Sequence, residues 1–343
     1  TSLARPWTCS ARSCASPPSP EELERQRTQA LDNLRVSLSQ PGSLASLATT
    51  RLNFGDSAYG TLTTERTLQA MTPQDLSDFH SRYIRPDQAI LTFSGDITPE
   101  QARELAQKAF GDWRATTPPS AAAPSVPAQT AAPRVVVVNL PGAGQAAVTV
   151  SSRSIARTDE AYVPLTLGNT LLGGSYTSRL NQEIRINRGL SYGARSGVGA
   201  MAQSGLFSAS TQTKNETADE VVELLLAEIG KMAATAPAET ELGPRRAIMI
   251  GGFGRSLESV GGLGALVAEL AAYDLPLEEL ARYADRVKAV TPEQVRAAFA
   301  GKLPDDRANV VVAGDASLFI DDLRAKYPNV EVIDASAINF DSD

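Results

Sequence analysis

Residues Ser178–Ser196 read SRLNQEIRINRGLSYGARS, a helical pattern that ends near a glycine and passes into a strand starting near Tyr192. Within this stretch Arg185 precedes Tyr192 by seven residues. A guanidinium presents several fixed hydrogen-bond donors, and a phenol donates one. Both side chains are thus hydrogen-bond donors near the predicted junction of the helix and the strand.

Histidine is nearly absent, because the chain contains only His80. A zinc hydrolase usually holds its metal with two imidazoles and a carboxylate, so this sequence cannot assemble such a centre alone. No GxSxG elbow accompanies His80, and we expect it to pack at a helix end rather than act as a base. Cys9 and Cys14 provide neither a disulfide framework nor a pair of metal-binding CxxC motifs, and we expect both to be inert.

The charge balance excludes two classes of partner. The 343 residues include 32 Lys and Arg against 39 Asp and Glu, with a net charge of −7. Such a chain offers no electrostatic footprint for nucleic acid and no dense basic cluster for an anionic membrane. No apolar run approaches the ~18 residues of a membrane-spanning helix. The sequence predicts a soluble protein and leaves cytoplasm and periplasm both open.

An internal repeat indicates two related domains. Leu68–Asp96 and Val287–Asp315 share one pattern without a gap, at an offset of 287 − 68 = 219 residues. Each copy predicts a threonine N-cap followed by proline, an amphipathic helix and an apolar strand, at residues 89–95 in the first copy and 309–314 in the second. Two copies of one domain are the simplest explanation.

The second copy begins near Arg134 with RVVVVNL, so its counterpart would begin at 134 − 219 = −85. We therefore expect about 85 residues of the first copy to be missing, through a truncated or misread start. The predicted plan is an irregular start at 1–19, the C-terminal part of the first domain at 20–114, an Ala/Pro linker at 115–133, the second domain at 134–335, and a tail at 336–343.

The predicted fold class is α+β, with two homologous domains that each form a largely antiparallel sheet with helices on one face. In the second domain we expect strands at 134–140, 146–153, 192–201 and 205–213, helices at 159–174 and around 178–185, and three or four helices within 217–289.

RGLSY and the segment at 249–276, MIGGFGRSLESVGGLGALVAELAAYDLP, resemble the pitrilysin and insulinase family of zinc metallopeptidases, the inverzincins. The resemblance covers Pro20 to about Ala335 and is greatest to short bacterial two-domain members. Active members carry HxxEH, whose histidines bind zinc and whose glutamate activates water. This sequence has no HxxEH, and the resemblance places Asn33 where a further glutamate ligand would stand. An amide is a poor zinc ligand.

Some members of that family work as pairs, and this sequence is similar to the subunit that lacks HxxEH. The resemblance then implies that Arg185 clamps a carbonyl of a peptide substrate and Tyr192 donates to the oxyanion, while zinc and HxxEH belong to a sister subunit. Arg188 does not match the family spacing. The ordinary alternative is a tyrosine packed at a strand start and an arginine on a solvated helix face.

Two other functions stay open. One is a peptide-binding or scaffold protein without a hydrolytic role, and the other is an N-terminally truncated zinc metallopeptidase, against which Asn33 counts. A peptide could pair with the Gly- and Ser-rich strands, although the family's substrate edge falls in the missing part. The glycines at 251–254 lack the third glycine of a nucleotide loop, and Glu216, Glu220 and Glu223 suggest a solvated helix face.

Overall fold

A computed structural model of the chain describes residues 19–115, 126, 132–303 and 307–338. These residues group into two compact units that interleave along the sequence. Unit 1 draws on residues within 1–34, 63–123 and 254–277, and unit 2 on those within 35–62, 124–253 and 278–343. The domain boundaries drawn from the sequence stay a prediction. Cys9, Cys14, most of the expected linker and the end of the expected tail lie outside the described residues.

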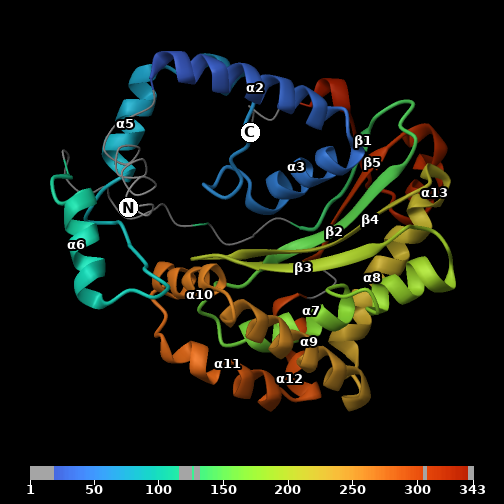
Figure 1. The fold of residues 1–343 in the computed structure, drawn as a ribbon. Helices are drawn as coiled ribbons and strands as arrows, with labels where there is room; N and C mark the ends of the chain where they lie inside the picture. The colour runs from blue at the N-terminus through green and yellow to red at the C-terminus, as the bar shows by residue number, and fades with distance from the viewer. Residues whose placement is uncertain (1–18, 116–125, 127–131, 304–306, 339–343) are drawn as a thin grey trace. The chain divides into compact units, whose positions relative to one another are not determined.

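One mixed six-stranded sheet forms the centre of unit 2, in the order β3-β4-β2-β5-β1-β6 (Figure 1). Its strands are β1 Val135–Asn139, β2 Ala146–Ser154, β3 Ala194–Ala200, β4 Gly205–Thr213, β5 Asn309–Gly314 and β6 Glu331–Asp334. β1 runs parallel to β5 and β6, and the other pairings are antiparallel. The α+β class is confirmed, and the first five strands lie where the sequence predicted them.

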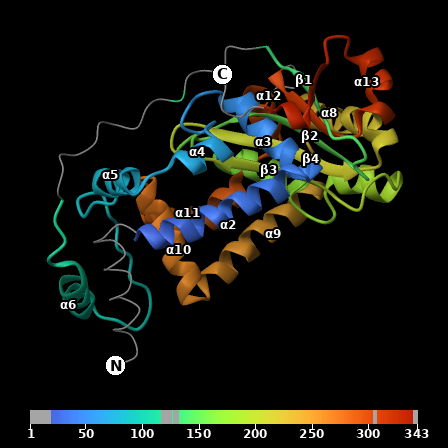
Figure 2. The same ribbon diagram turned by 90° about the horizontal axis from the view of Figure 1, so that it is seen from above.

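Three helices cover one face of this sheet and a fourth covers the other (Figures 1 and 2). On the first face lie α7 Tyr162–Leu172, α8 Ala218–Ala234 and α12 Pro292–Lys302. They bury the main apolar core, in which the rings of Phe207 and Phe299 meet edge to face at 6.4 Å. On the second face α3 Pro41–Phe54 packs its apolar side against β1, β2 and β5.

Further elements complete unit 2. They are the π-helix η1 Asn181–Asn187, the helices α11 Glu278–Ala289 and α13 Ile320–Lys326, and the 3₁₀ turns η2 Asn215–Thr217, η4 Ala316–Leu318 and η5 Ala335–Ala337. α9 Glu239–Leu257 belongs to unit 2 up to Phe253. The glycines at 251–254 are part of this helix, as expected from their sequence surroundings.

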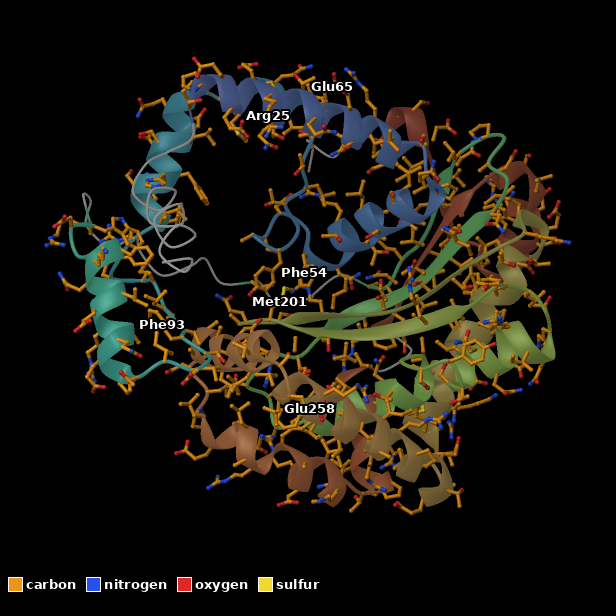
Figure 3. All side chains as sticks on the ribbon, viewed as in Figure 1. Arg25, Phe54, Glu65, Phe93, Met201 and Glu258 are labelled. Carbon is orange, nitrogen blue, oxygen red and sulfur yellow. The ribbon has the colours of Figure 1, made fainter. Side chains whose placement is uncertain are left out.

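Buried hydrogen bonds fix α3 on the sheet. Asn53, which is 1% exposed, donates to the Ser151 hydroxyl of β2 at 2.9 Å and accepts from the Asn309 amide of β5 at 3.3 Å. Phe54 ends α3 and Met201 follows β3, and both lie at the same end of the sheet (Figure 3). Since an unpaired buried amide is costly, this network sets where α3 lies.

Unit 1 contains helices and no strand among its described residues. Its helices are α2 Pro20–Leu38 (up to Leu34), α4 Glu65–Ala70, α5 Pro73–Tyr83, α6 Pro99–Phe110 and α10 Val260–Ala272. The strand predicted at 89–95 is wrong, because these residues are irregular and Ile90 is 58% exposed. A strand needs backbone partners, and no described residue of unit 1 supplies them.

The repeat extends beyond the passage in which the sequence displays it. Adding 219 to the bounds of α2 gives those of α9 (20 + 219 = 239, 38 + 219 = 257), and α5 maps onto α12 in the same way (73 + 219 = 292, 83 + 219 = 302). Thr72 and Thr291 cap the corresponding helices, as predicted. The start of α3 maps onto that of α10 (41 + 219 = 260), yet α3 belongs to unit 2 and α10 to unit 1. Among these three pairs, α3 and α10 are therefore exchanged: α3 of the first copy belongs to unit 2, and α10 of the second copy belongs to unit 1.

Candidate functional site

Arg185 and Tyr192 lie in contact in unit 2. The guanidinium carbon of Arg185, on η1, is 4.8 Å from the centroid of the Tyr192 ring. It is also 4.8 Å from the centroid of the Tyr176 ring, so the cation interacts with two aromatic rings. Tyr192 is 90% exposed, which is not the state of a packed strand-start tyrosine. The sequence did not single out Tyr176, because it stands in a loop without periodicity.

The backbone reverses direction after η1, which brings Tyr192 next to Arg185. Gly189 has a φ of +64°, a left-handed conformation that suits glycine. Around this turn the Leu190 amide donates to the Ile184 carbonyl at 2.9 Å, and the Gly189 amide donates to the Arg185 carbonyl at 3.1 Å. The glycine of RGLSY therefore ends the helix and reverses the chain, which explains a spacing of seven residues between two groups in contact.

Side chains on both sides hold the segment that carries Tyr192. The Asn181 side-chain oxygen accepts from the Ala194 amide at 2.8 Å, which fixes the start of β3 to η1. The Thr211 hydroxyl of β4 donates to the Gly193 carbonyl at 2.8 Å. The residues flanking Tyr192 are thus tied to rigid elements, although its ring stands in solvent.

Arg185 and Tyr192 line a cleft of about 770 Å³ within unit 2. It is lined by Ser46 of α3, by the segment that joins η1 to β3, and by residues of β2 and β4. A volume of this order is typical of ligand sites. Much of the lining is polar but uncharged, which suits hydrogen bonding to an extended backbone.

Arg188 is occupied elsewhere. It forms ion pairs with Glu183 at 2.7 Å and with Glu220 at 2.8 Å, and it does not line the cleft. The hydrogen bond from Arg188 is the main cause that lowers the pKa of Glu183 below its usual value. Of the three glutamates expected on a solvated face, Glu220 takes part in this pair and Glu223 accepts from the Tyr327 hydroxyl.

The donor atoms of the described residues do not fit a zinc site. No cluster of three or more His, Cys, Asp or Glu residues with metal-binding geometry occurs among them. Asn33 is exposed on α2, and its side-chain oxygen accepts from the Gln29 amide at 3.2 Å. His80 lies half-buried in the last turn of α5. We therefore assign none of the described residues to a metal.

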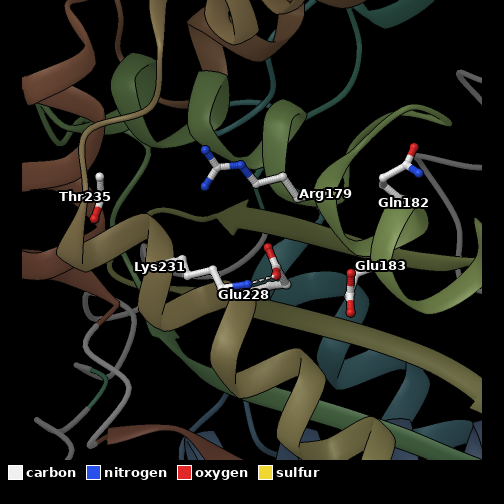
Figure 4. Close-up of a pocket in the computed structure, with 6 residues that line it drawn as sticks. All are labelled: Arg179, Gln182, Glu183, Glu228, Lys231 and Thr235. Carbon is white, nitrogen blue, oxygen red and sulfur yellow. Dashed lines mark hydrogen bonds and ion pairs between the residues drawn. The ribbon is translucent and has the colours of Figure 1, made fainter. Parts of the chain in front are cut away.

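A second cleft, of about 430 Å³, opens beside η1 and α8 (Figure 4). Its two cations are already paired within the protein. Lys231 contacts the buried carboxylate of Glu228 at 2.5 Å, and Arg179 binds Glu241 through two hydrogen bonds at 2.9 and 2.8 Å. These pairs account for the positive charges at this cleft, and we assign it no ligand.

Comparison with known proteins gives the family. Residues 70–244, just over half of the chain, match the family model described as the peptidase M16 inactive domain. An uncharacterized zinc protease of Streptomyces coelicolor is 28% identical over 286 residues, which are 81% of this chain and 61% of that protein. Another, from Mycobacterium leprae, is 26% identical over 247 residues, or 69% of this chain and 54% of that protein. The chain thus spans less than two thirds of the length of these relatives.

Solved structures share the fold. The peptidase M16 inactive domain from Pseudomonas fluorescens aligns with a TM-score of 0.75 and 24% identity, over 86% of this chain and 71% of that one. A protease from Helicobacter pylori aligns with a TM-score of 0.84 and 20% identity, over 91% and 76%. The family membership predicted from RGLSY is confirmed. The chain belongs to the peptidase M16 family and matches the description of its inactive domain.

Proposed function

We propose that the chain is a non-catalytic, substrate-clamping subunit of a heteromeric zinc metallopeptidase that degrades peptides. The contact between Arg185 and Tyr192 at the lining of a cleft is the observation that carries this proposal. The match to an inactive domain and the poor fit of the described residues to zinc support it from a second direction. Zinc would belong to a partner subunit that bears HxxEH.

Each of the two residues has a distinct chemical task. Hydrolysis of a peptide bond passes through a tetrahedral species whose carbonyl oxygen has become an oxyanion. The Tyr192 hydroxyl stands on an exposed ring from which it can donate a hydrogen bond to that oxygen. Arg185 presents a planar set of donors that can hold a neighbouring backbone carbonyl in register. Contact with two rings restricts the guanidinium before the substrate binds, which lowers the entropy lost on binding.

A second function has one observation in its favour. The cleft forms within unit 2 of this chain alone, so it could bind a peptide without any hydrolysis. A peptide-binding or scaffold protein would use the same cleft. It would not depend on the Tyr192 hydroxyl, because no oxyanion forms when a peptide is merely bound.

The test compares the chain alone with its complex. The tagged chain is captured from its native lysate, the HxxEH-bearing subunit is identified by mass spectrometry, and the complex is rebuilt from purified subunits. We expect fluorogenic-peptide hydrolysis that a zinc chelator abolishes in the complex, and none with the chain alone. Tyr192→Phe should lower kcat about 10²-fold, as for the loss of an oxyanion donor.

Tyr83→Phe is the matched control, since Tyr83 is exposed and does not line the cleft. Unchanged turnover in the Tyr192→Phe complex would refute the role assigned to this residue. A complex that binds peptide without ever cleaving it would favour the scaffold function. Chelator-sensitive hydrolysis by the chain alone would contradict the proposal outright.

A further inference from the structure

The charge of the cleft differs in sign from that of the chain. Arg185 and Arg195 are the only charged residues that line it, and its described lining contains no aspartate or glutamate. The whole chain nevertheless carries a net charge of −7. A cation without a carboxylate beside it, within a concave site, raises the local concentration of anionic ligands.

Arg195 is not paired with any residue that the structure describes. Its side chain is exposed on β3, and no described residue forms an ion pair or a hydrogen bond with its guanidinium. Other arginines close to it in sequence are engaged, Arg179 by Glu241 and Arg188 by Glu183 and Glu220. Arg195 is thus a cation directed into a cleft and available to a ligand.

The strands next to Arg195 place hydroxyl groups on the same face of the sheet. In the strand register Arg195 of β3 stands opposite Ser210 of β4, and Ser210 stands opposite Thr149 of β2. All three residues line the cleft, together with Ser208 two positions before Ser210 on the same face. A carboxylate accepts hydrogen bonds from a guanidinium and from hydroxyls, whereas an ammonium group gains nothing from Arg195.

We infer that Arg195, with the hydroxyls of Ser208 and Ser210, forms a subsite for a carboxylate of the bound peptide, so that the cleft selects acidic peptides. The carboxylate is an Asp or Glu side chain or the C-terminus. This inference rests on the proposed function for the view that the cleft receives a peptide. It adds a substrate class and a residue that determines specificity, and Arg185 and Tyr192 keep their separate tasks.

The experiment measures peptide binding to the chain alone, by fluorescence anisotropy. The probes are decapeptides of Gly, Ser and Ala with a neutral fluorophore, carrying one central Glu or Gln, each with a free or an amidated C-terminus. We expect the Glu peptide, or the peptide with a free C-terminus, to bind about fivefold to tenfold more tightly than its neutral counterpart. The two arms identify which carboxylate the subsite takes.

Arg195→Gln should remove this preference, so that the charged and the neutral peptide bind equally well. Arg195→Glu should reverse it. Arg324→Gln is the matched control, because Arg324 is exposed on α13 and lies outside the cleft. Equal binding of charged and neutral peptides by the unchanged chain, or a preference that persists in Arg195→Gln, would overturn the inference.

A failure of the acidic subsite can be distinguished from a failure of the proposed function. If Tyr192→Phe lowers turnover of the complex while acidic and neutral peptides are cleaved equally well, the clamp function stands and the acidic subsite fails. If Arg195 sets an acidic preference in binding while Tyr192→Phe leaves turnover unchanged, the subsite stands and the clamp function fails.

Discussion

The guanidinium carbon of Arg185 lies 4.8 Å from the centroid of the Tyr192 ring, so the two groups form one unit rather than two independent side chains. Tyr176 contacts the same guanidinium at the same distance. A change in any of the three residues should therefore alter the other two. Substitutions here are best compared with close variants that keep either the ring or the charge.

Removing the second ring should weaken the clamp without abolishing it. Tyr176 is 64% exposed, and a cation–π contact at an exposed site contributes about 0.5–1 kcal/mol. In the rebuilt complex we expect Tyr176→Ala to raise KM by about twofold to fivefold with little change in kcat. Tyr176→Phe keeps the ring and should behave like the unchanged protein. A large loss in Tyr176→Phe would show that its hydroxyl, and not its ring, is what matters.

The charge of Arg185 alone should not be sufficient. Arg185→Lys keeps a cation but loses the planar set of donors that fits a carbonyl and two aromatic faces. We expect kcat/KM of the complex to fall by about tenfold or more, since charged hydrogen bonds contribute about 1.5–3 kcal/mol. Arg188→Lys is the neighbouring control, because Arg188 only pairs with surface glutamates. Equal losses in both variants would argue against a specific clamp at Arg185.

How far the sequence predicts this molecule can be judged from four residues. The resemblance carried by RINRGLSY predicted Arg185 and Tyr192 as site residues, and the structure places the two side chains in contact, while their roles stay a prediction. It could not identify Tyr176, whose position follows from the packing of a loop and not from any local pattern. Arg195 was missed as well. Its proposed role depends on the absence of carboxylates from the cleft around it. Which residues surround it is known only once the strands are in register.

The same distinction holds for the fold. β5 and the segment at 89–95 have similar apolar sequences at equivalent positions of the repeat, yet only β5 is a strand. β5 lies between β1 and β2, whereas the described residues around 89–95 offer no strand to pair with. Local sequence sets the preference for an extended chain, and partner strands decide whether a sheet forms. The placement of α3 on the second face also depends on tertiary contacts, such as those of Asn53.

Loss of the buried amide on α3 should destabilise unit 2. Asn53→Ala removes hydrogen bonds to Ser151 and Asn309 and leaves those two buried groups short of partners. We expect the free energy of unfolding to fall by about 1–3 kcal/mol, measured by urea unfolding. Asn33→Ala is a matched control, since Asn33 is also helical but exposed. If both variants lose the same stability, the buried network does not fix α3.

The backbone conformation at Gly189 should affect both stability and the proposed activity. Its φ of +64° costs a residue with a Cβ about 1–2 kcal/mol, whereas asparagine tolerates this region better than alanine. Space is not the obstacle, because a Cβ at Gly189 would meet no atom within 4 Å. We therefore expect Gly189→Ala to lower both stability and turnover of the complex, by displacing Tyr192 from Arg185, and Gly189→Asn to lower them less. The check is urea unfolding together with kcat/KM for both variants. If alanine and asparagine have equal effects, the conformation of this turn does not determine how Tyr192 is placed.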